Sequence, residues 1–285
     1  MRDKNELTQT PTLQENIAEN DKLRSDYIRR IVLNNIYLNS CSSGPTLIPK
    51  VIIQFWHNLD DLPLDVQECL NSWETLENDG FQRILYDNTM AIKIIKDAYG
   101  EPYITAFNSC NHPAMRCDYF RLCYILKNGG FYLDADEFYQ GVDCNQYFQD
   151  DKLKIQPLCY DVLSESMVDP EKFIHNKEFS DNWIFYVNNN PIIAPPDHPI
   201  IRKALERSTN ILLNSKEGLE IQSTTGPGNL SASVVANLID AKSLGVEDLR
   251  IIPNWNKVSI SPWPLSYRND KRNWRLWDKN EIWKD

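Results

Sequence analysis

The spacing of apolar residues along the chain switches between a strand-like and a helix-like period. Short apolar runs rich in β-branched or aromatic residues, typical of buried strands, occur at 50–56, 81–87 and 130–136. Helices are predicted between them at 64–77, 88–100 and 112–128. Strands that alternate with helices in this way indicate an α/β fold with a layered sheet.

The pattern is weaker beyond residue 140. Residues 183–190 and 191–199 are predicted to form strands or turns around the same core. A further helix is expected at 198–209, and residues 222–239 are expected to form a glycine-proline turn that leads into another helix.

The N-terminal part has a different character from the rest. Residues 21–39 place Leu23, Tyr27 and Ile31 at helical spacing, so we expect an amphipathic helix. Docking on the core is the simplest use of its apolar face, and a role at a membrane surface is the alternative. We therefore divide the chain into an N-terminal extension, 1–46, and a main α/β domain, 47–285.

Charge and cysteine content narrow the classes of function. The 285-residue chain carries a formal net charge of −10, which argues against electrostatic binding of nucleic acid. An anionic ligand would need a metal ion or a few well-placed cations. Seven cysteines, an odd number without a CxxC pair, indicate reduced thiols. With no signal peptide or membrane-length apolar run, we expect a cytoplasmic protein, with peripheral contact at the inner membrane face as a variant.

The sequence KNGGFYLDAD, residues 127–136, contains two candidate ligand-binding residues. It places Asp134 and Asp136 at the end of a predicted buried strand, the edge where open α/β sheets bind ligands. Two carboxylates suit Mg²⁺ or Mn²⁺, which also bind phosphate oxygens. A solvated turn is the alternative explanation for a DxD sequence taken alone.

Two further elements give this motif a context. Asp118 and Arg121 lie at i, i+3 on a helix whose neighbouring residues are apolar, so a buried pair able to bind sugar hydroxyls is predicted rather than a surface ion pair. Trp56 ends the first predicted strand, where it packs in the core or stacks on a nucleobase.

Five stretches form a recognisable set: IPKVIIQFW (48–56), SW (72–73), RCDYFRLCYILKNGGFYLDAD (116–136), HP (198–199) and TGP (225–227). Together they resemble glycosyltransferase family 32, which includes a yeast initiating mannosyltransferase and bacterial capsule transferases. The catalytic domain of the large clostridial glucosylating toxins has a related core. The resemblance implies a GT-A fold (a Rossmann-like mixed sheet flanked by helices), a nucleotide-sugar donor, a divalent cation and retention of anomeric configuration.

The resemblance also implies roles for individual residues. Trp56 would stack on the donor base, and Asp118 and Arg121 would contact the donor sugar. Asp134 would touch ribose or sugar, and Asp136 would be the more direct metal ligand. Asn189 would be a polar residue near the donor sugar. The turn 225–227 would shape the acceptor side.

Two positions depart from the family pattern. Ile53 stands where the family's first strand usually carries a histidine. The toxins close a C-terminal tryptophan over the donor; here Trp274 and Trp277 are the candidates, and packing against the core is the alternative for both.

We therefore predict a metal-dependent retaining hexosyltransferase that uses Mn²⁺ or Mg²⁺ and, in preference, a UDP-sugar. The acceptor is a hydroxyl of a glycan, a lipid-linked glycan or a protein, and bacterial surface-glycan (polysaccharide) synthesis is the simplest setting. The alternatives are a toxin-like effector that glycosylates a host protein, a catalytically degenerate scaffold, and a phosphatase of the haloacid dehalogenase type.

Overall fold

The structure, a computed structural model, describes residues 20–36, 46–215, 219–240, 248–262, 264–278 and 283. The strands of its central sheet are β1 (Val51–Phe55), β2 (Gln82–Tyr86), β3 (Gly130–Tyr132), β5 (Leu153–Ile155), β9 (Ile192–Ala194) and β10 (Leu249–Ile251). The helices are α2 (Asp21–Asn34), α3 (Leu64–Ser72), α4 (Asn88–Tyr99), α5 (Glu101–Asn108), α6 (Pro113–Asn128), α7 (Pro199–Asn214), α8 (Ile221–Thr224), α9 (Pro227–Asp240) and α10 (Trp255–Val258).

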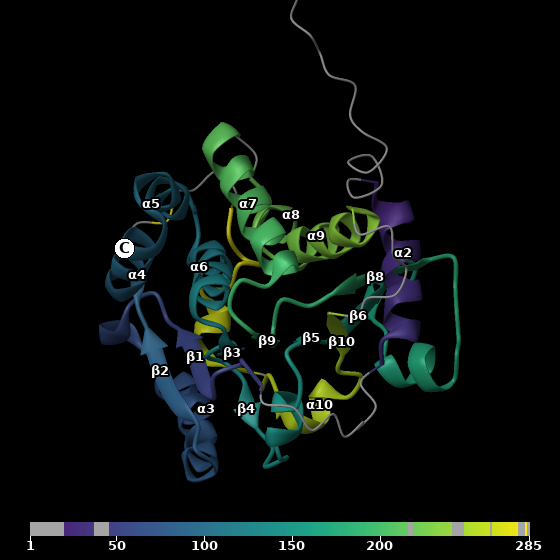
Figure 1. The fold of residues 1–285 in the computed structure, drawn as a ribbon, viewed down its shortest axis with the longest axis horizontal. Helices are drawn as coiled ribbons and strands as arrows, with labels where there is room; N and C mark the ends of the chain where they lie inside the picture. The colour runs from purple at the N-terminus through teal and green to yellow at the C-terminus, as the bar shows by residue number, and fades with distance from the viewer. Residues whose placement is uncertain are drawn as a thin grey trace, which may run out of the picture.

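The central sheet is mixed, with the strand order β10-β5-β9-β3-β1-β2 (Figure 1). β1 is parallel to both β2 and β3, so the carboxyl ends of these three strands meet at one edge. β9 lies antiparallel between β3 and β5, and β10 is parallel to β5. The residues that follow β1 and β3 are thereby brought next to the residues that precede β9.

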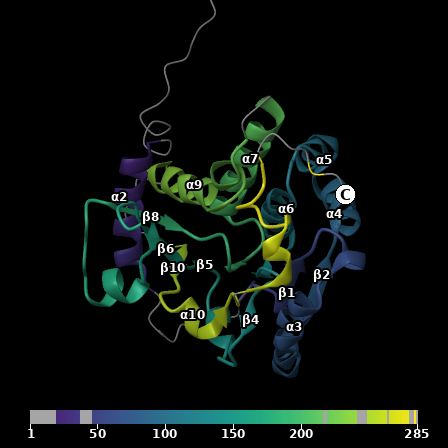
Figure 2. The ribbon, with the colours of Figure 1, turned by 180° about the vertical axis from the view of Figure 1, so that it is seen from behind.

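Helices cover both faces of the sheet, as Figures 1 and 2 show from opposite sides. Successive residues of one strand point to opposite faces, so Ile53 joins the core beneath α4, α5, α6, α7 and α9, and Ile52 joins the core on the other side. That second core contains Trp73 and Trp255. The predicted α/β fold class, with a mixed sheet flanked by helices and an N-terminal helix, is confirmed.

Two smaller sheets extend the molecule. One is antiparallel and consists of β6 (Pro157–Asp161), β7 (Ser166–Met167) and β8 (Trp183–Val187). The other pairs β4 (Phe138–Tyr139) with β11 (Ser259–Ile260) in antiparallel fashion. β4 follows the DxD sequence directly, so this second pair ties the C-terminal part of the chain to that turn.

Helix α2 is docked on the main core. Ile28 and Val32 are fully buried, and the Ser25 hydroxyl oxygen accepts a hydrogen bond from the backbone N–H of Phe185 in β8 (2.9 Å). The division of the chain at residue 46 stays a prediction, but this helix shares the core of the larger unit. In the described ranges, no helix combines the length and the apolar character needed to cross a membrane.

The same local arrangement starts both α6 and α7. Each helix has proline as its first residue and histidine as its N-cap. Nδ1 of His112 accepts from the Ala114 N–H (3.0 Å), and Nδ1 of His198 accepts from the Ile200 N–H (3.3 Å). Proline at the first helical position has no N–H that needs a partner, so the His-Pro pair marks a helix start.

Between residues 64 and 136, the observed elements differ from the predicted ones at three places. The predicted strand 130–136 ends at Tyr132, because the N–H of Asp134 bonds to a side chain, that of Asn190, instead of continuing the sheet (3.0 Å). The predicted helix 64–77 ends at Ser72 and continues as a 3₁₀ turn, Trp73–Asp79. Helix α5 was not predicted.

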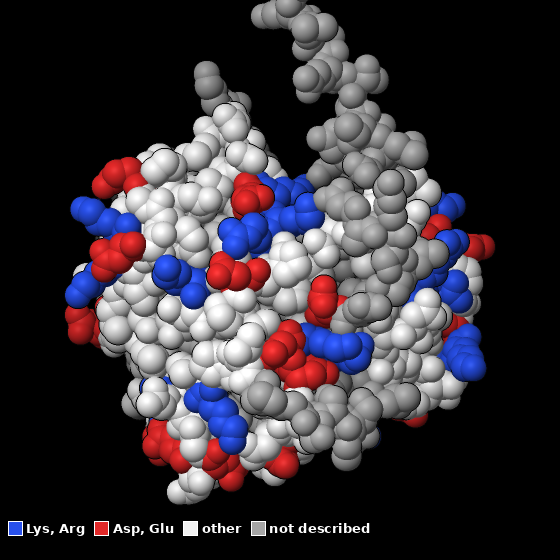
Figure 3. Space-filling model, viewed as in Figure 1, with Lys and Arg blue, Asp and Glu red and all other residues white. Residues whose placement is uncertain are grey.

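Surface charge is distributed in small groups. On the face seen in Figure 3, Lys and Arg side chains lie among Asp and Glu side chains and do not form one basic surface. The arrangement on this face is in keeping with the net charge of −10.

Candidate active site

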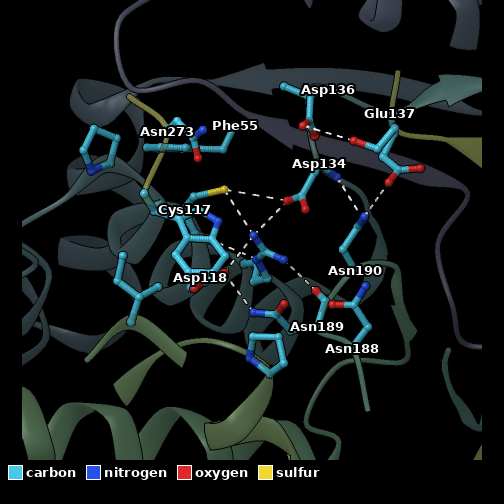
Figure 4. Close-up of a pocket in the computed structure, with 18 of the residues that line it drawn as sticks. Phe55, Cys117, Asp118, Asp134, Asp136, Glu137, Asn188, Asn189, Asn190 and Asn273 are labelled. Carbon is cyan, nitrogen blue, oxygen red and sulfur yellow. Dashed lines mark hydrogen bonds and ion pairs between the residues drawn. The ribbon is translucent and has the colours of Figure 1, made fainter. Parts of the chain in front are cut away.

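A cavity of about 470 Å³ lies at the carboxyl ends of β1 and β3. Its size is typical of small-molecule sites. The six residues singled out from the sequence all line it: Trp56, Asp118, Arg121, Asp134, Asp136 and Asn189. Figure 4 shows Asp118, Asp134 and Asn189 pointing toward one another from three different elements.

The Arg121 guanidinium is the centre of the site. Its Nη2 contacts one carboxylate oxygen of Asp118 (2.9 Å) and one of Asp134 (2.8 Å), while Nη1 donates to the backbone carbonyl of Asn189 (2.7 Å). Its side chain is only 3% exposed, and its carbon Cζ lies 4.3 Å from the centre of the Tyr132 ring. One cation therefore links α6, the turn after β3 and the segment before β9.

Asp118 is held on both of its carboxylate oxygens. Besides Arg121, it accepts from the Asn189 side-chain amide (2.8 Å) and from the Thr225 hydroxyl (3.3 Å). Burial raises the pKa of this carboxyl, and Arg121 opposes that rise. Of the TGP turn predicted on the acceptor side, Thr225 thus contacts Asp118 and Pro227 lines the cavity.

Asp134 is the first carboxylate of the DxD sequence, and its pKa is raised. Burial raises its pKa to about 6 and the neighbouring negative charge of Asp136 adds to the rise, whereas Arg121 lowers it. The side chain of Asn190 fixes this turn from both ends, since its oxygen accepts from the Asp134 N–H (3.0 Å) and its nitrogen donates to Glu137 Oε1 (3.0 Å).

Asp136 points to a different set of partners, contributed by the C-terminal part of the chain. Its Oδ2 accepts hydrogen bonds from the Tyr267 hydroxyl (2.7 Å) and the Ser261 hydroxyl (3.3 Å), and it pairs with Arg268 Nη2 (2.5 Å). Sequence reasoning missed these three residues. They lie more than 120 positions beyond Asp136, and no motif signals the contact.

Glu137 was also missed by sequence reasoning. It is 7% exposed, and burial raises its pKa to about 7. Within the described residues its Oε2 is a buried oxygen without a hydrogen-bond partner. The signal was available in the sequence, because Glu137 follows Asp136 directly and extends the acidic run.

Trp56 lies at the predicted place, but its ring is well covered. Only 8% of the residue is exposed, its Nε1 donates to the carbonyl of Asp61 (3.2 Å), and its ring meets that of Tyr267 edge to face (5.3 Å). Stacking on a base would need a displacement of Tyr267, so this role stays a prediction.

The remaining residues singled out from the sequence differ in whether they line the cavity. Trp274 lines the cavity beneath Arg275, whose Cζ lies 4.5 Å from the ring centre. Trp277 is 9% exposed and packs beside the His112 ring (5.2 Å). Ile53, at the position where the family usually has histidine, is buried in the main core.

The fit of a divalent cation can be tested on the donor atoms present. Among the described residues, no group of three or more His, Cys, Asp or Glu is placed to hold a metal by itself. Cations that bind nucleotide phosphates typically use only one or two carboxylates and take their other ligands from phosphate and water. Asp134 and Asp136 line the same cavity, so these two carboxylates fit such a cation.

Comparisons with known proteins agree with this chemistry. Residues 63–152 match the family model described as a glycosyltransferase sugar-binding region containing a DXD motif. The match includes Asp118, Arg121 and the sequence Asp134-Ala135-Asp136. By class the protein is a glycosyltransferase, and the family resemblance noted in the sequence is confirmed in this region.

The chain was also compared with solved structures and with curated proteins. The chain is similar to a solved structure named PaToxG glycosyltransferase, with 13% identity and a TM-score of 0.44 over 80% of this chain and 82% of that one. Among curated proteins, none matches the chain.

Proposed function

We propose that the protein is a metal-dependent retaining hexosyltransferase that moves a sugar from a nucleoside diphosphate to a hydroxyl acceptor. The observation that carries this proposal is the buried Asp118–Arg121–Asp134 network beside Asp136, within a cavity large enough for a sugar nucleotide. A buried charge network is costly for stability alone, so its place in a cavity favours a binding role.

The donor is best described as a UDP-sugar. The carboxylate of Asp118 and the amide of Asn189, which bond to each other, can accept from and donate to the hydroxyls of the sugar. The choice of UDP over GDP rests on the resemblance to bacterial members of family 32.

The protein's part in the reaction is binding and orientation. Arg121 fixes Asp118 and Asp134 at the positions where the sugar would lie, so that little reorganisation is needed during the reaction. A divalent cation bound with Asp134 and Asp136 would supply a Lewis acid for the charge on the leaving diphosphate. Cleavage is expected to pass through an oxocarbenium-like sugar.

Retention by same-face attack suits the residues in the cavity better than a covalent intermediate on sulfur. Cys117 lines the cavity, but burial raises the pKa of its thiol to about 12, so it stays protonated at neutral pH. In same-face attack the leaving phosphate oxygen can accept the acceptor's proton, and no protein base is required.

The acceptor is a hydroxyl of a glycan, a lipid-linked glycan or a protein. We place the enzyme in bacterial surface-glycan synthesis, in the cytoplasm or at the inner face of the membrane. A toxin-like effector that glycosylates a host protein is the second candidate, since the catalytic domain of the large clostridial glucosylating toxins has a related core. Intact Asp118, Arg121, Asp134 and Asp136 speak against a degenerate scaffold.

The test is donor hydrolysis across a panel of UDP- and GDP-sugars, with Mn²⁺ or with EDTA, for the wild type and Asp136→Ala. We expect one donor to be hydrolysed, only with metal, and the variant to be at least 100-fold less active while remaining folded. Asp197→Ala removes an exposed acid outside the cavity and should leave hydrolysis unchanged. If no donor is hydrolysed and none raises the melting temperature with Mn²⁺, the proposal is wrong.

A further inference from the structure

A cation besides any metal ion would help the cavity to bind the donor's diphosphate, because half of the charged side chains in its walls are acidic. The chain as a whole is acidic. Four carboxylates line the cavity: Asp118, Asp134, Asp136 and Glu137. The same walls carry four arginines: Arg121, Arg268, Arg272 and Arg275. Which of these guanidinium groups can bind phosphate depends on what each already contacts.

Arg121 is too deeply engaged to bind a diphosphate. Its donors reach Asp118, Asp134 and the carbonyl of Asn189, and its side chain is 3% exposed. Turning it toward a ligand would leave the buried Asp118 and the partly exposed Asp134 without their cation, which is energetically costly.

Arg272 and Arg275 are directed elsewhere. Two guanidinium nitrogens of Arg272 donate to the carboxylate of Asp270 (3.1 and 2.7 Å). Its Nη1 also forms an ion pair with Asp61 (3.0 Å). Arg275 lies over the ring of Trp274 (4.5 Å). Neither contacts the DxD sequence in the described structure.

Arg268 is the arginine that reaches the predicted metal ligand. It lies on a 3₁₀ turn, Ser266–Asn269, and its Nη2 pairs with Oδ2 of Asp136. The contacts of Ser261, Tyr267 and Arg268 with this carboxylate all fall on Oδ2. A cation could therefore engage Oδ1 of Asp136 while the guanidinium stays beside it.

A cation at Asp136 also changes what Arg268 prefers. The metal would reduce the attraction between that carboxylate and the guanidinium, and the diphosphate would offer new anionic oxygens in the same place. The planar fork of arginine matches the spacing of phosphate oxygens. We propose that Arg268 binds the diphosphate of the donor, next to the divalent cation, and so carries charge recognition that Arg121 cannot provide.

This inference rests on the proposed function, and its test measures binding rather than turnover. Calorimetric titration of UDP and of uridine, both with Mn²⁺, is compared for the wild type, Arg268→Ala and Arg268→Gln. Loss of a charged hydrogen bond to phosphate should weaken UDP binding about 10- to 100-fold and change uridine binding by less than about twofold. Arg268→Gln keeps much of the volume and a hydrogen-bond donor to Asp136, so it serves if the alanine variant fails to fold.

Arg83→Ala is the matched control. Arg83 is 18% exposed and pairs with Glu74 and Glu77, outside the cavity, so UDP affinity should stay within about twofold of the wild type. If the Arg268 variants bind UDP as well as or better than the wild type, or lose UDP and uridine equally, Arg268 is not a diphosphate ligand and the inference is overturned. If the wild type binds neither UDP nor GDP with Mn²⁺, the proposed function itself fails.

Discussion

Arg121 is shared between a buried carboxylate, Asp118, and a partly exposed one, Asp134, which makes its removal different from the removal of either acid. Asp118 and Asp134 both rely on it, and burial already raises the pKa of each. Without Arg121, Asp118 would be left in the interior without a cation, and Asp134 would lose its ion pair. Without Asp118, Arg121 keeps its pair with Asp134.

We therefore expect Arg121→Ala to lower the free energy of unfolding by about 3–5 kcal/mol and Asp118→Ala to lower it by less. Urea denaturation of the metal-free proteins measures both values. Arg202→Ala breaks a surface ion pair between Arg202, whose side chain is 49% exposed, and Asp197, whose side chain is 79% exposed. It should change the free energy of unfolding by less than about 1 kcal/mol. An equal loss for Arg121→Ala and Asp118→Ala would contradict the shared-cation interpretation.

At the residue scale, the spacing of residues along the sequence predicted only part of the candidate site. Asp118, Arg121, Asp134 and Asp136 fall within one helix-strand unit, where local periodicity is enough to place them together. Arg268 approaches Asp136 from 132 positions away, through folding of the C-terminal part of the chain. Nothing in the sequence around Arg268 encodes that partner.

The starts of α6 and α7 show how single elements respond to pH. His112 and His198 are almost fully buried caps, and the second nitrogen of each lies within hydrogen-bond distance of a backbone carbonyl, that of Lys271 or Asp248 (2.9 and 3.1 Å). Burial lowers the pKa of both imidazoles, with the carbonyl contacts opposing it. The folded protein therefore holds these rings neutral.

Proton binding by the two histidines determines how the free energy of unfolding changes with pH. Since the folded pKa lies below the unfolded value of about 6.5, the unfolded chain binds the proton first, and the free energy of unfolding falls as the pH drops below about 6.5. We expect His198→Asn, which keeps a capping side chain, to lose less stability than the wild type between pH 7.5 and pH 5.5. Urea denaturation at the two pH values checks this, and an unchanged pH dependence in the variant would count against it.

The junction between α6 and β3 depends on a residue without a side chain. At Gly130, φ is +120°, and a Cβ would lie 2.8 Å from Cδ1 of Ile53 and 3.0 Å from the carbonyl oxygen of Val51. The absence of a side chain at Gly130 allows β3 to lie this close to β1.

Gly130→Ala should lower the free energy of unfolding by more than about 2 kcal/mol, since strain and steric overlap act together. Gly80→Ala is the matched control, because φ there is +83° but a Cβ would meet nothing within 4 Å. It should cost only the backbone strain, about 1 kcal/mol. Thermal unfolding of the two variants measures the difference, which should favour Gly80→Ala; the reverse order would refute this account of the junction.

Elements were more predictable than their arrangement. β1, β2 and β3 are short apolar runs, and the helices between them carry apolar residues at helical spacing, so local pattern was enough. The antiparallel insertion of β9 between β3 and β5 was not predicted, because strand order depends on contacts between distant parts of the chain. The 3₁₀ turn after α3 was missed for a similar reason: Trp73 is fully buried and its indole N–H donates to the carbonyl of Glu137 (2.8 Å).

At the scale of the whole molecule, α2 is a structural part of the enzyme. Ile28 is fully buried in the core that also supports α9 and β8, whereas Leu23 on the same helix is 44% exposed. Ile28→Ala should lower the free energy of unfolding by about 2–5 kcal/mol, and Leu23→Ala by less than about 1 kcal/mol. A single urea transition should be kept in both variants. If Ile28→Ala has no effect, α2 contributes nothing to the common core.

The edge of the central sheet joins the two ends of the described chain, and this has a consequence for how the protein is made. Ile36, just after α2, pairs with Ile251 in β10, and the Ile251 N–H donates to the carbonyl of Asn35 (2.7 Å). On the ribosome, roughly ten to forty seconds of translation separate these partners. A nascent chain cannot complete its sheet until β10 has emerged from the exit tunnel. Until then, the open edge of β5 is exposed to chaperones, proteases and other nascent chains.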